Sequence, residues 1–521
     1  MEFKDQTLIT VQRAKGQKTK KAAENCTIVQ WPCPDSIDDF NNALILTNSI
    51  DSSNSSSPQA AGLPWLTSQW SMPVFPDPLL SPGVMRSGLY SSFMDIYLPK
   101  SPKVDQFGFF QLAASSQTDE PCLLEALDAL SLVAVGSVQK DRKLLTESVV
   151  AYGRALRHLS KAVVAPNARS NDDLLAATTV LSSCALYEEI GQHAGGWGTH
   201  VTGCQQLIAA RGPETLKSEL AMSLYATTRY GALCFALIER RAPLMAMPRW
   251  REVAMRGHHV GDEASVLFYD AAIQVPGLLE RHDELSMDEV TTETAGVVLG
   301  GVEKLLLECS HIEIALRDWF TDWQTHALLD PDPTNILPEG LLYSEQPIDF
   351  FPTFLSLVPD RTFPTAFTFP DFATAYLASL YWLSMYYLRS TIQPLHRLRH
   401  DLDRAWYPDS TTAVSEPEIL DCISNLCRCI PYFAEPVSSS GGHIAIFLPM
   451  RTAAIYFTTH GLWQQAKWVG MVKNGVFTKG LAPPDVKGLD QVKRQGSDYG
   501  RKGAVRQDWR RAFWEINQLA K

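Results

Sequence analysis

The chain has 521 residues, 45% hydrophobic and 20% charged, so it is long and apolar enough to bury a large core. Its net charge of −11 excludes nucleic-acid binding through the average field, and any such contact would need a local basic patch. No uninterrupted apolar run reaches about 18 residues, so no membrane span or signal peptide is indicated. The ten cysteines follow no disulfide spacing and indicate reduced intracellular thiols.

The first 90 residues are predicted to stay outside the globular body. Residues 1–60 begin with a basic cluster and turn Ser/Asn-rich, which predicts a disordered segment. The basic cluster is either a solvated tail or a nuclear-import segment, and it consists of Arg13, Lys15, Lys18, Lys20 and Lys21. Residues 61–90 are Pro-rich with scattered aromatic residues, which predicts an extended linker.

Residues 91–521 show apolar residues at helical spacing and almost no strand signal. We therefore predict an all-α fold, an irregular bundle of about ten or more helices. Residues 268–279 look less regular, and residues 330–368 are predicted to be a proline-punctuated loop. A basic amphipathic helix is predicted to close the chain, with basic residues Lys493, Arg494, Arg501, Lys502, Arg506, Arg510 and Arg511.

A helical hairpin over residues 170–213 is predicted to lie at the centre of the fold. Ser170 is the expected N-cap of a helix over residues 172–190, and Arg211-Gly212-Pro213 is expected to end the second helix. In that second helix Trp197, His200, Cys204 and Leu207 form one stripe. The stripe is interpreted as core packing with a hydrogen-bonded His200, and the alternative is that Trp197 and His200 line a pocket for an effector.

No enzyme constellation stands out in the sequence. Dinucleotide, phosphate-loop, nucleophile-elbow and zinc-protease motifs are missing. The pair Asp172-Asp173 is interpreted as helix capping, because Ala176 and Ala177 stand where a metal-binding set would need a third acid. We therefore predict no enzymatic activity, and neither catalytic, cofactor-binding nor metal-binding residues.

The cysteines do not form a zinc site by spacing. Cys422, Cys427 and Cys429 share a predicted helix and are interpreted as core residues. Cys26 and Cys33 repeat one interval of a fungal binuclear zinc cluster. Two thiols cannot complete a tetrahedral site, so this spacing is read as chance or as a relic.

The order of several segments resembles a known family, the regulatory (middle-homology) domain of fungal Zn₂Cys₆ transcription factors. The resemblance runs from about Ser91 to the C-terminus. Its densest pieces are Ala126 to Leu130, Tyr152 to Leu159, Asp173 to Glu188, Gly196 to Leu207, and Arg211-Gly212-Pro213. The resemblance implies an all-helical domain that modulates transcription, with DNA binding performed by an N-terminal zinc cluster. No six-cysteine module is present in this sequence, and zinc is expected only if such a module exists.

The resemblance implies a nuclear transcriptional regulator, plausibly of a secondary-metabolite gene cluster. Its expected partners are the transcription machinery or a DNA-bound paralogue, with a homodimer and a small-molecule effector as further candidates. Direct DNA binding is expected to be weak or absent, and no DNA-binding residue is assigned. The alternatives are an inhibitory module acting on a full-length paralogue and an α-helical enzyme with an unrecognised site.

Overall fold

The computed structural model describes residues 82–100, 105–116, 118–165, 167–191, 197–256, 263–285, 294–329, 337, 341–403, 413–477 and 479–482. The chain divides into two units, residues 1–54 and 55–521, and every described residue belongs to the second unit. The predicted N-terminal segment, most of the predicted linker and the predicted C-terminal basic helix lie outside the described residues.

The described part of the chain is helical almost throughout, which confirms the predicted all-α class with ten or more helices. The first group comprises α3 (Pro82–Tyr97), α4 (Asp105–Ser115), α5 (Pro121–Gln139), α6 (Arg142–Ala162), α7 (Asp172–Cys184), α8 (Glu188–Gly191), α9 (Trp197–Arg211) and α10 (Glu219–Glu239). The second comprises α11 (Pro248–Arg256), α12 (Glu263–Ala272), α13 (Val275–Glu284), α14 (Ala295–Leu329), α15 (Pro352–Leu357), α16 (Phe372–Leu402), α17 (Glu416–Ala434), α18 (Ser439–Thr459) and α19 (Trp463–Val476). Strands β1 (Ser344–Pro347) and β2 (Thr365–Thr368) pair antiparallel, with Ser344 opposite Thr368.

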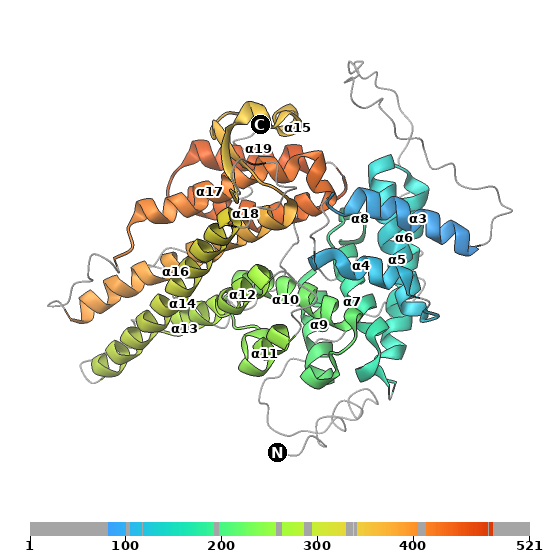
Figure 1. The fold of residues 1–521 in the computed structure, drawn as a ribbon, viewed down its shortest axis with the longest axis horizontal. Coiled ribbons are helices and arrows are strands. Elements are labelled where there is room, and N and C mark those ends of the chain that lie inside the picture. Colours follow the sequence, from blue (N-terminus) through green and yellow to red (C-terminus); the bar gives the residue numbers. More distant parts are fainter. Residues whose placement is uncertain are drawn as a thin grey trace, which may run out of the picture. The chain divides into compact units, whose positions relative to one another are not determined.

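Helix α10 connects two sets of helices (Figure 1). On one side it packs against α4, α7 and α9, and α7 in turn packs against α5. On the other side α10 contacts α12 and α13, which lie against the long helices α14 and α16. Helix α16 packs on α17, which packs on α18, and α18 packs on α19 and reaches back to α3. The two sets therefore meet at α10, at the α3–α18 contact and where the chain after α7 pairs with the chain after α19.

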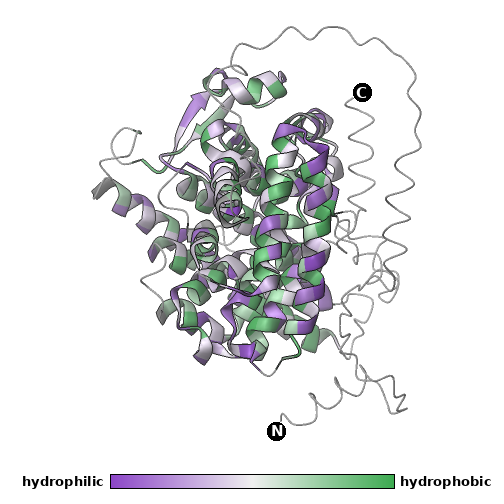
Figure 2. Ribbon diagram, turned by 90° about the vertical axis from the view of Figure 1, so that its right-hand side faces the viewer, coloured by the Kyte–Doolittle hydropathy of each residue, from purple (hydrophilic) through white to green (hydrophobic). Residues whose placement is uncertain are grey.

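Hydrophobic and hydrophilic residues alternate along the same helices, as expected where one face of each helix packs on its neighbours (Figure 2). Helix α5 is the most apolar of these, and its buried residues include Leu123, Leu127, Leu130 and Ala134. By length and composition it is the one helix among the described residues that could cross a membrane. Its apolar faces are instead covered by α3, α6 and α7, so packing within the body accounts for its composition.

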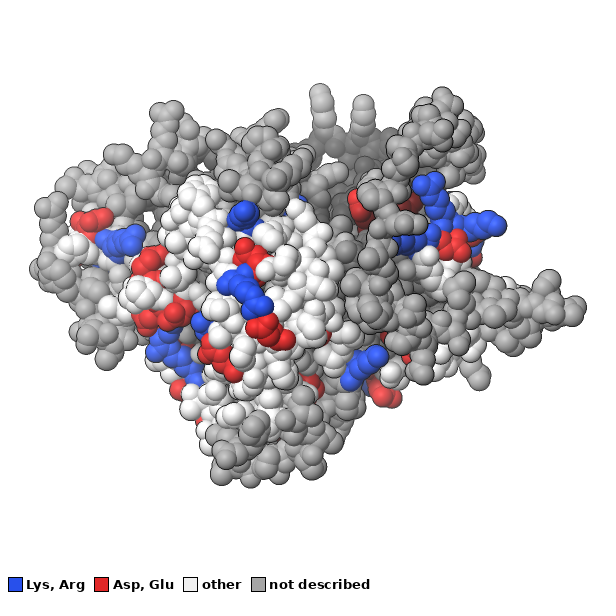
Figure 3. Space-filling view, turned by 90° about the horizontal axis from the view of Figure 1, so that it is seen from above, with Lys and Arg blue, Asp and Glu red and all other residues white. Residues whose placement is uncertain are grey.

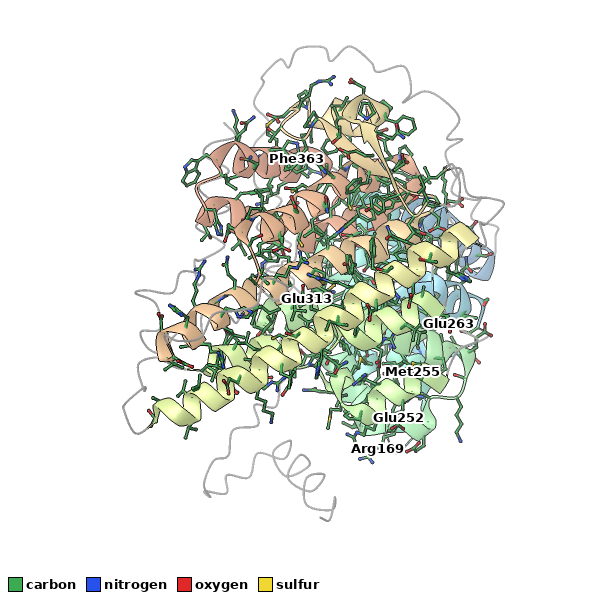
Figure 4. The ribbon with its side chains drawn as sticks, turned by 60° about the vertical axis from the view of Figure 1, so that its left-hand side comes forward. Arg169, Glu252, Met255, Glu263, Glu313 and Phe363 are labelled. Atoms are coloured by element: carbon green, nitrogen blue, oxygen red, sulfur yellow. The ribbon has the colours of Figure 1, made fainter. Side chains whose placement is uncertain are left out.

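Helices α14 and α16 run alongside each other, and ion pairs join them. Glu313 of α14 lies at this junction (Figure 4), where its carboxylate accepts from Arg389 Nε at 3.1 Å and from Arg317 Nη2 at 2.6 Å. Further along, Arg399 of α16 pairs with Glu303. Both ion pairs join residues of α14 to residues of α16 that lie far away in the sequence. They therefore help to hold the two helices in register.

Three segments have a conformation that differs from the one predicted from the sequence. Helix α3 begins at Pro82, so residues 82–90 are helical where extended chain was predicted. Residues 268–272 and 275–279 belong to the regular helices α12 and α13, which a short turn separates, because Pro276 falls in the first turn of α13, where a proline is tolerated. The predicted loop over residues 330–368 contains the β1–β2 hairpin and α15.

The predicted helix over residues 172–190 is also interrupted, since α7 ends at Cys184. Beyond it the chain pairs with a distant segment: Glu188 N donates to Gly480 O at 2.8 Å, and Ala482 N donates to Leu186 O at 2.9 Å. Gly480 has a φ of +75°, and a Cβ there would come within 2.4 Å of Ser137 Oγ. The interruption is thus caused by a long-range backbone pairing that local periodicity does not record.

Of the two helix ends predicted for this hairpin, the N-cap of α7 was wrong and the end of α9 is confirmed. Asn171 caps α7, because its side chain accepts from Asp173 N at 2.9 Å, whereas Ser170 lies in a preceding 3₁₀ turn. Helix α9 ends at Arg211, as predicted, and Gly212 follows with a φ of +82°. Such a backbone favours glycine, which explains the stop.

Candidate ligand pocket

A cavity of about 330 Å³ lies where the two sets of helices meet. It falls at the lower end of the range of about 300–1,000 Å³ typical of small-molecule sites. Its walls come from α3, α4, α7, α9 and α10 on one side and from α16, α18 and α19 on the other. Neither set alone would enclose it, so its shape depends on how the two pack.

The wall is largely aromatic and aliphatic. Tyr97, Phe109 and Phe110 form one cluster, in which Tyr97 and Phe110 meet edge to face with ring centroids 5.4 Å apart. The other apolar lining residues include Leu186, Trp197, Val201, Tyr230, Ile238, Tyr376, Ile444, Ala445, Phe447 and Leu448. Such a surface favours an apolar body of similar shape.

Trp197 reaches the cavity because α9 and α10 approach closely. The Trp197 and Phe235 rings meet edge to face at 5.9 Å. A Cβ on Gly198 would come within 2.4 Å of Phe235, so glycine is needed at this crossing. Trp197 is half-buried and lines the cavity, in agreement with the pocket alternative for this residue.

His200 is part of the packed core. It is buried, and its Nε2 lies 2.7 Å from the hydroxyl of Tyr152 on α6. Burial lowers the pKa of His200 to about 4, so the ring is neutral near pH 7. His200 does not appear among the described residues that line the cavity. The stripe predicted on α9 is therefore split between pocket and core.

The hydroxyl and thiol groups of the wall are mostly committed to the protein itself. Thr179 Oγ1 donates to Leu175 O at 2.9 Å, and Thr228 Oγ1 donates to Leu224 O at 2.7 Å. Burial raises the pKa of the Cys204 thiol to about 12 and also raises that of Cys234. These thiols stay protonated and are poor nucleophiles. The arrangement supports binding and offers no activated nucleophile among the described lining residues.

Two cationic side chains, Arg451 of α18 and Lys473 of α19, stand out in this apolar wall. Both are half-buried, and burial lowers the pKa of each. Glu239 at the end of α10 interacts electrostatically with Arg451 and with Arg241, and burial raises its pKa. No Asp or Glu occurs among the described lining residues, so the cavity wall carries positive charge.

The other residues considered from the sequence have structural roles. Asp172 pairs with the buried Arg211 and accepts from Ser218, while Asp173 accepts from Thr118 Oγ1 at 2.6 Å. Their main role is thus to join segments rather than to cap α7. Cys422, Cys427 and Cys429 are buried in α17 as predicted. Among the described residues, no three His, Cys, Asp or Glu side chains gather in a way that could hold a metal ion.

The described surface offers little support for direct DNA contact. On the face drawn in Figure 3, Lys and Arg side chains lie beside Asp and Glu side chains rather than in a patch of one sign. The two basic clusters noted in the sequence fall outside the described residues.

The cavity, which sequence reasoning could not locate, is the most distinctive feature of the described part. Beyond Trp197, which the sequence offered as an alternative pocket residue, the cations Arg451 and Lys473 on otherwise apolar helix faces were a signal that sequence reasoning did not use.

Part of the chain matches a known protein family. Residues 88–267 match the family described as fungal specific transcription factor domain. A protein of Emericella nidulans, described as uncharacterized protein AN5342, is 27% identical over 176 residues. That match covers 32% of this chain and 37% of the relative, so the chain spans well under half of that protein. No solved structure is significantly similar to the chain.

Proposed function

Because the chain carries a fungal-specific transcription factor domain at residues 88–267, we propose that it is a nuclear transcriptional regulator that responds to a small molecule. The observation that carries the response to a small molecule is the cavity between this domain and the C-terminal helices. A ligand there would touch the matched segment through α3, α4, α7, α9 and α10, and the rest of the chain through α16, α18 and α19. A ligand bound there would therefore stabilise the arrangement in which the matched segment and the C-terminal helices pack together around it.

We propose that the regulator reaches DNA through a partner, either the transcription machinery or a DNA-bound paralogue. A zinc cluster of the fungal type needs six cysteines. Of the ten cysteines in this chain, eight are buried in helices of the described body, which leaves Cys26 and Cys33. These two residues cannot supply six thiolate ligands. We also propose that two copies of the chain form a homodimer, which would bind such a partner.

The regulatory proposal is tested by tethering. The chain is fused to a heterologous DNA-binding domain and tested on a reporter gene, with the DNA-binding domain alone as the control. Transcription that rises or falls relative to this control supports the proposal and decides between activation and repression. A fusion that is expressed, nuclear and without effect on the reporter would contradict it. An inhibitory module would instead lower the output of its full-length paralogue in the same cells.

Nuclear import is proposed to depend on the basic cluster of residues 13–21, because a short basic segment suits an acidic import receptor. The test is a fluorescent fusion in which Arg13, Lys15, Lys18, Lys20 and Lys21 are changed to Ala. The matched control carries five Ala substitutions nearby, at Ser52, Ser53, Ser55, Ser56 and Ser57. Loss of nuclear signal in the first variant alone supports import through this cluster, and an unchanged signal refutes it.

A narrower proposal is that the regulated genes form a secondary-metabolite cluster. It is supported by the family resemblance. Comparing transcripts from a deletion strain and its parent tests it. Changes confined to one contiguous set of biosynthetic genes would support the proposal, and changes scattered through primary metabolism would oppose it.

A further inference from the structure

Aromatic rings line the cavity from both sets of helices. Tyr230 of α10 and Tyr376 of α16 are in contact, with ring centroids 4.9 Å apart. Phe109 and Phe110 of α4 pack together with centroids 4.0 Å apart, and Phe447 of α18 also lines the cavity. The wall therefore combines aromatic rings from several helices, and a flat ring system packs well against such a surface.

The threonines of the wall use their hydroxyl hydrogens within their own helices. Thr227 Oγ1 donates to Ser223 O at 3.0 Å. Thr179 and Thr228 likewise donate to the carbonyl oxygens four residues earlier. A hydroxyl group has a single hydrogen to donate, so these three side chains have none left for a ligand.

The two cations of the wall interact with the protein itself. Burial lowers the pKa of Arg451, and Tyr387 of α16 and Glu239 of α10 interact electrostatically with this residue. Lys473 also takes part in an interaction within the protein. An anion that entered the cavity would leave water and compete with these existing partners. The alkyl stems of both cations, by contrast, add apolar surface to the wall.

The volume of the cavity limits the size of its ligand. A cavity of about 150 Å³ lined by Leu, Ile and Phe holds one benzene molecule. The present cavity, of about 330 Å³, is roughly twice as large. It therefore has room for a molecule of roughly two or three rings.

We propose that this cavity binds a neutral, largely hydrocarbon molecule built on two or three rings. Such a molecule replaces water along the aromatic and aliphatic wall, and its rings pack against the aromatic side chains. A charged group on the same skeleton weakens binding, because it leaves water without an available counter-charge. The absence of Asp and Glu from the described lining residues disfavours a cationic ligand for the same reason.

The test is a fluorescence titration of the purified full chain with two dyes that brighten on leaving water. N-phenyl-1-naphthylamine is neutral, and 8-anilino-1-naphthalenesulfonate has the same ring skeleton with one added sulfonate. The neutral dye is expected to saturate at one per chain with a dissociation constant in the micromolar range. The sulfonate is expected to bind at least roughly tenfold more weakly.

A variant that fills the cavity tests the location. Gly231 lines the cavity on α10, and a Cβ there would touch only Val201 Cγ2 at 3.8 Å, so a larger side chain enters without a backbone clash. Gly231→Leu is expected to weaken binding of the neutral dye at least roughly tenfold while keeping cooperative unfolding. If it fails to fold, Ala445→Leu on α18 fills the cavity from the other set of helices.

Gly153→Leu is the matched control, because it makes the same change on a half-buried helical glycine of α6 outside the lining. It should leave the affinity for the neutral dye unchanged. Three results would overturn the inference: no saturable binding of the neutral dye, sulfonate binding that is equal or tighter, and neutral-dye binding that survives filling of the cavity.

This ligand class rests on the proposed regulatory function only for its consequence in the cell. Binding is measured on purified protein, and regulation is measured with the reporter fusion. Binding of the neutral dye in the cavity, together with a fusion that leaves transcription unchanged, would support the ligand class and refute the regulator. A reporter response without neutral-dye binding would support the regulator and refute this ligand class.

Discussion

At the scale of single residues, the first decisive feature is the cap of α7, where the sequence offered two adjacent polar candidates. Ser170 and Asn171 both suit an N-cap, and only the backbone decides between them. Asn171 has extended backbone and accepts from Asp173 N, while Ser170 Oγ donates to Asn167 O at 3.2 Å within the preceding turn. A one-residue difference of this kind lies below what a sequence pattern resolves.

We expect Asn171→Ala to lower the free energy of unfolding by about 1 kcal/mol, the typical cost of losing an N-cap. Ser170→Ala should cost less than about 0.5 kcal/mol, because its hydroxyl bonds only within the local turn. Urea unfolding of the two variants beside the unchanged chain provides the comparison. Equal losses in both variants would show that Asn171 is not the cap that matters.

His200 links stability to pH. Its pKa is near 6.5 in the unfolded chain and is lowered to about 4 by burial in the folded one. Between these values the unfolded chain binds more protons, so stability is full above about pH 6.5 and declines as the pH falls towards 4. For this one residue the loss between pH 7.5 and pH 5 should be about 2 kcal/mol. His443, whose pKa burial lowers to about 3, acts in the same direction.

The pH effect is measured by unfolding the chain at pH 7.5, 6.5, 5.5 and 5.0. His200→Gln is expected to be less stable at pH 7.5 and to show a flatter decline than the unchanged chain. His311→Gln, an exposed histidine on α14, is the control and should leave the slope unchanged. A slope that is the same in all three proteins would rule out His200 as the titrating group.

At the scale of elements, helix existence followed from periodicity and helix ends often did not. The apolar stripes of α5, α6, α14 and α16 lie where the sequence indicates, because each of these helices buries one continuous face. The β1–β2 hairpin was missed since its strands are four residues each and begin or end near prolines. The break after Cys184 was missed because it depends on Gly480 and Ala482, nearly three hundred residues away. Local patterns contain no record of such partners.

The α14–α16 pair allows a comparison of two ion pairs on the same two helices. Glu313 and Arg389 are each 13% exposed, whereas Glu303 is 46% exposed. Removing the charge of Glu313 leaves a mostly buried guanidinium, so Glu313→Gln should cost about 2–3 kcal/mol. Glu303→Gln should cost less, under about 1 kcal/mol, because the partner Arg399 is buried to a similar degree but the Glu303 carboxylate is itself screened by solvent. Thermal unfolding of both variants measures these two costs. Equal shifts in Tm would contradict the expected effect of burial.

At the scale of the whole molecule, the cavity depends on contacts that no single segment specifies. From the sequence, Trp197 was interpreted as core packing with a pocket position as the alternative, whereas Arg451 and Lys473 of the same cavity come from helices more than two hundred residues further on. The family match ends at residue 267, so these two cations lie outside it. The sequence therefore indicated the family resemblance and, as an alternative, one lining residue, and the packing of α10 against both sets of helices supplied the rest of the cavity.

The last prediction concerns DNA. The chain carries a net charge of −11, and eight of its ten cysteines are buried in the described helices. Base readout needs side chains presented to a groove, whereas basic tails supply only phosphate contacts. We therefore expect the purified chain to bind DNA weakly, without preference among sequences, and with an affinity that falls steeply as salt increases. A salt-titrated binding assay on unrelated duplexes measures this, with the variant lacking the basic residues of 13–21 as the control. Nanomolar binding to one sequence at physiological salt would show that this chain reads DNA without a partner.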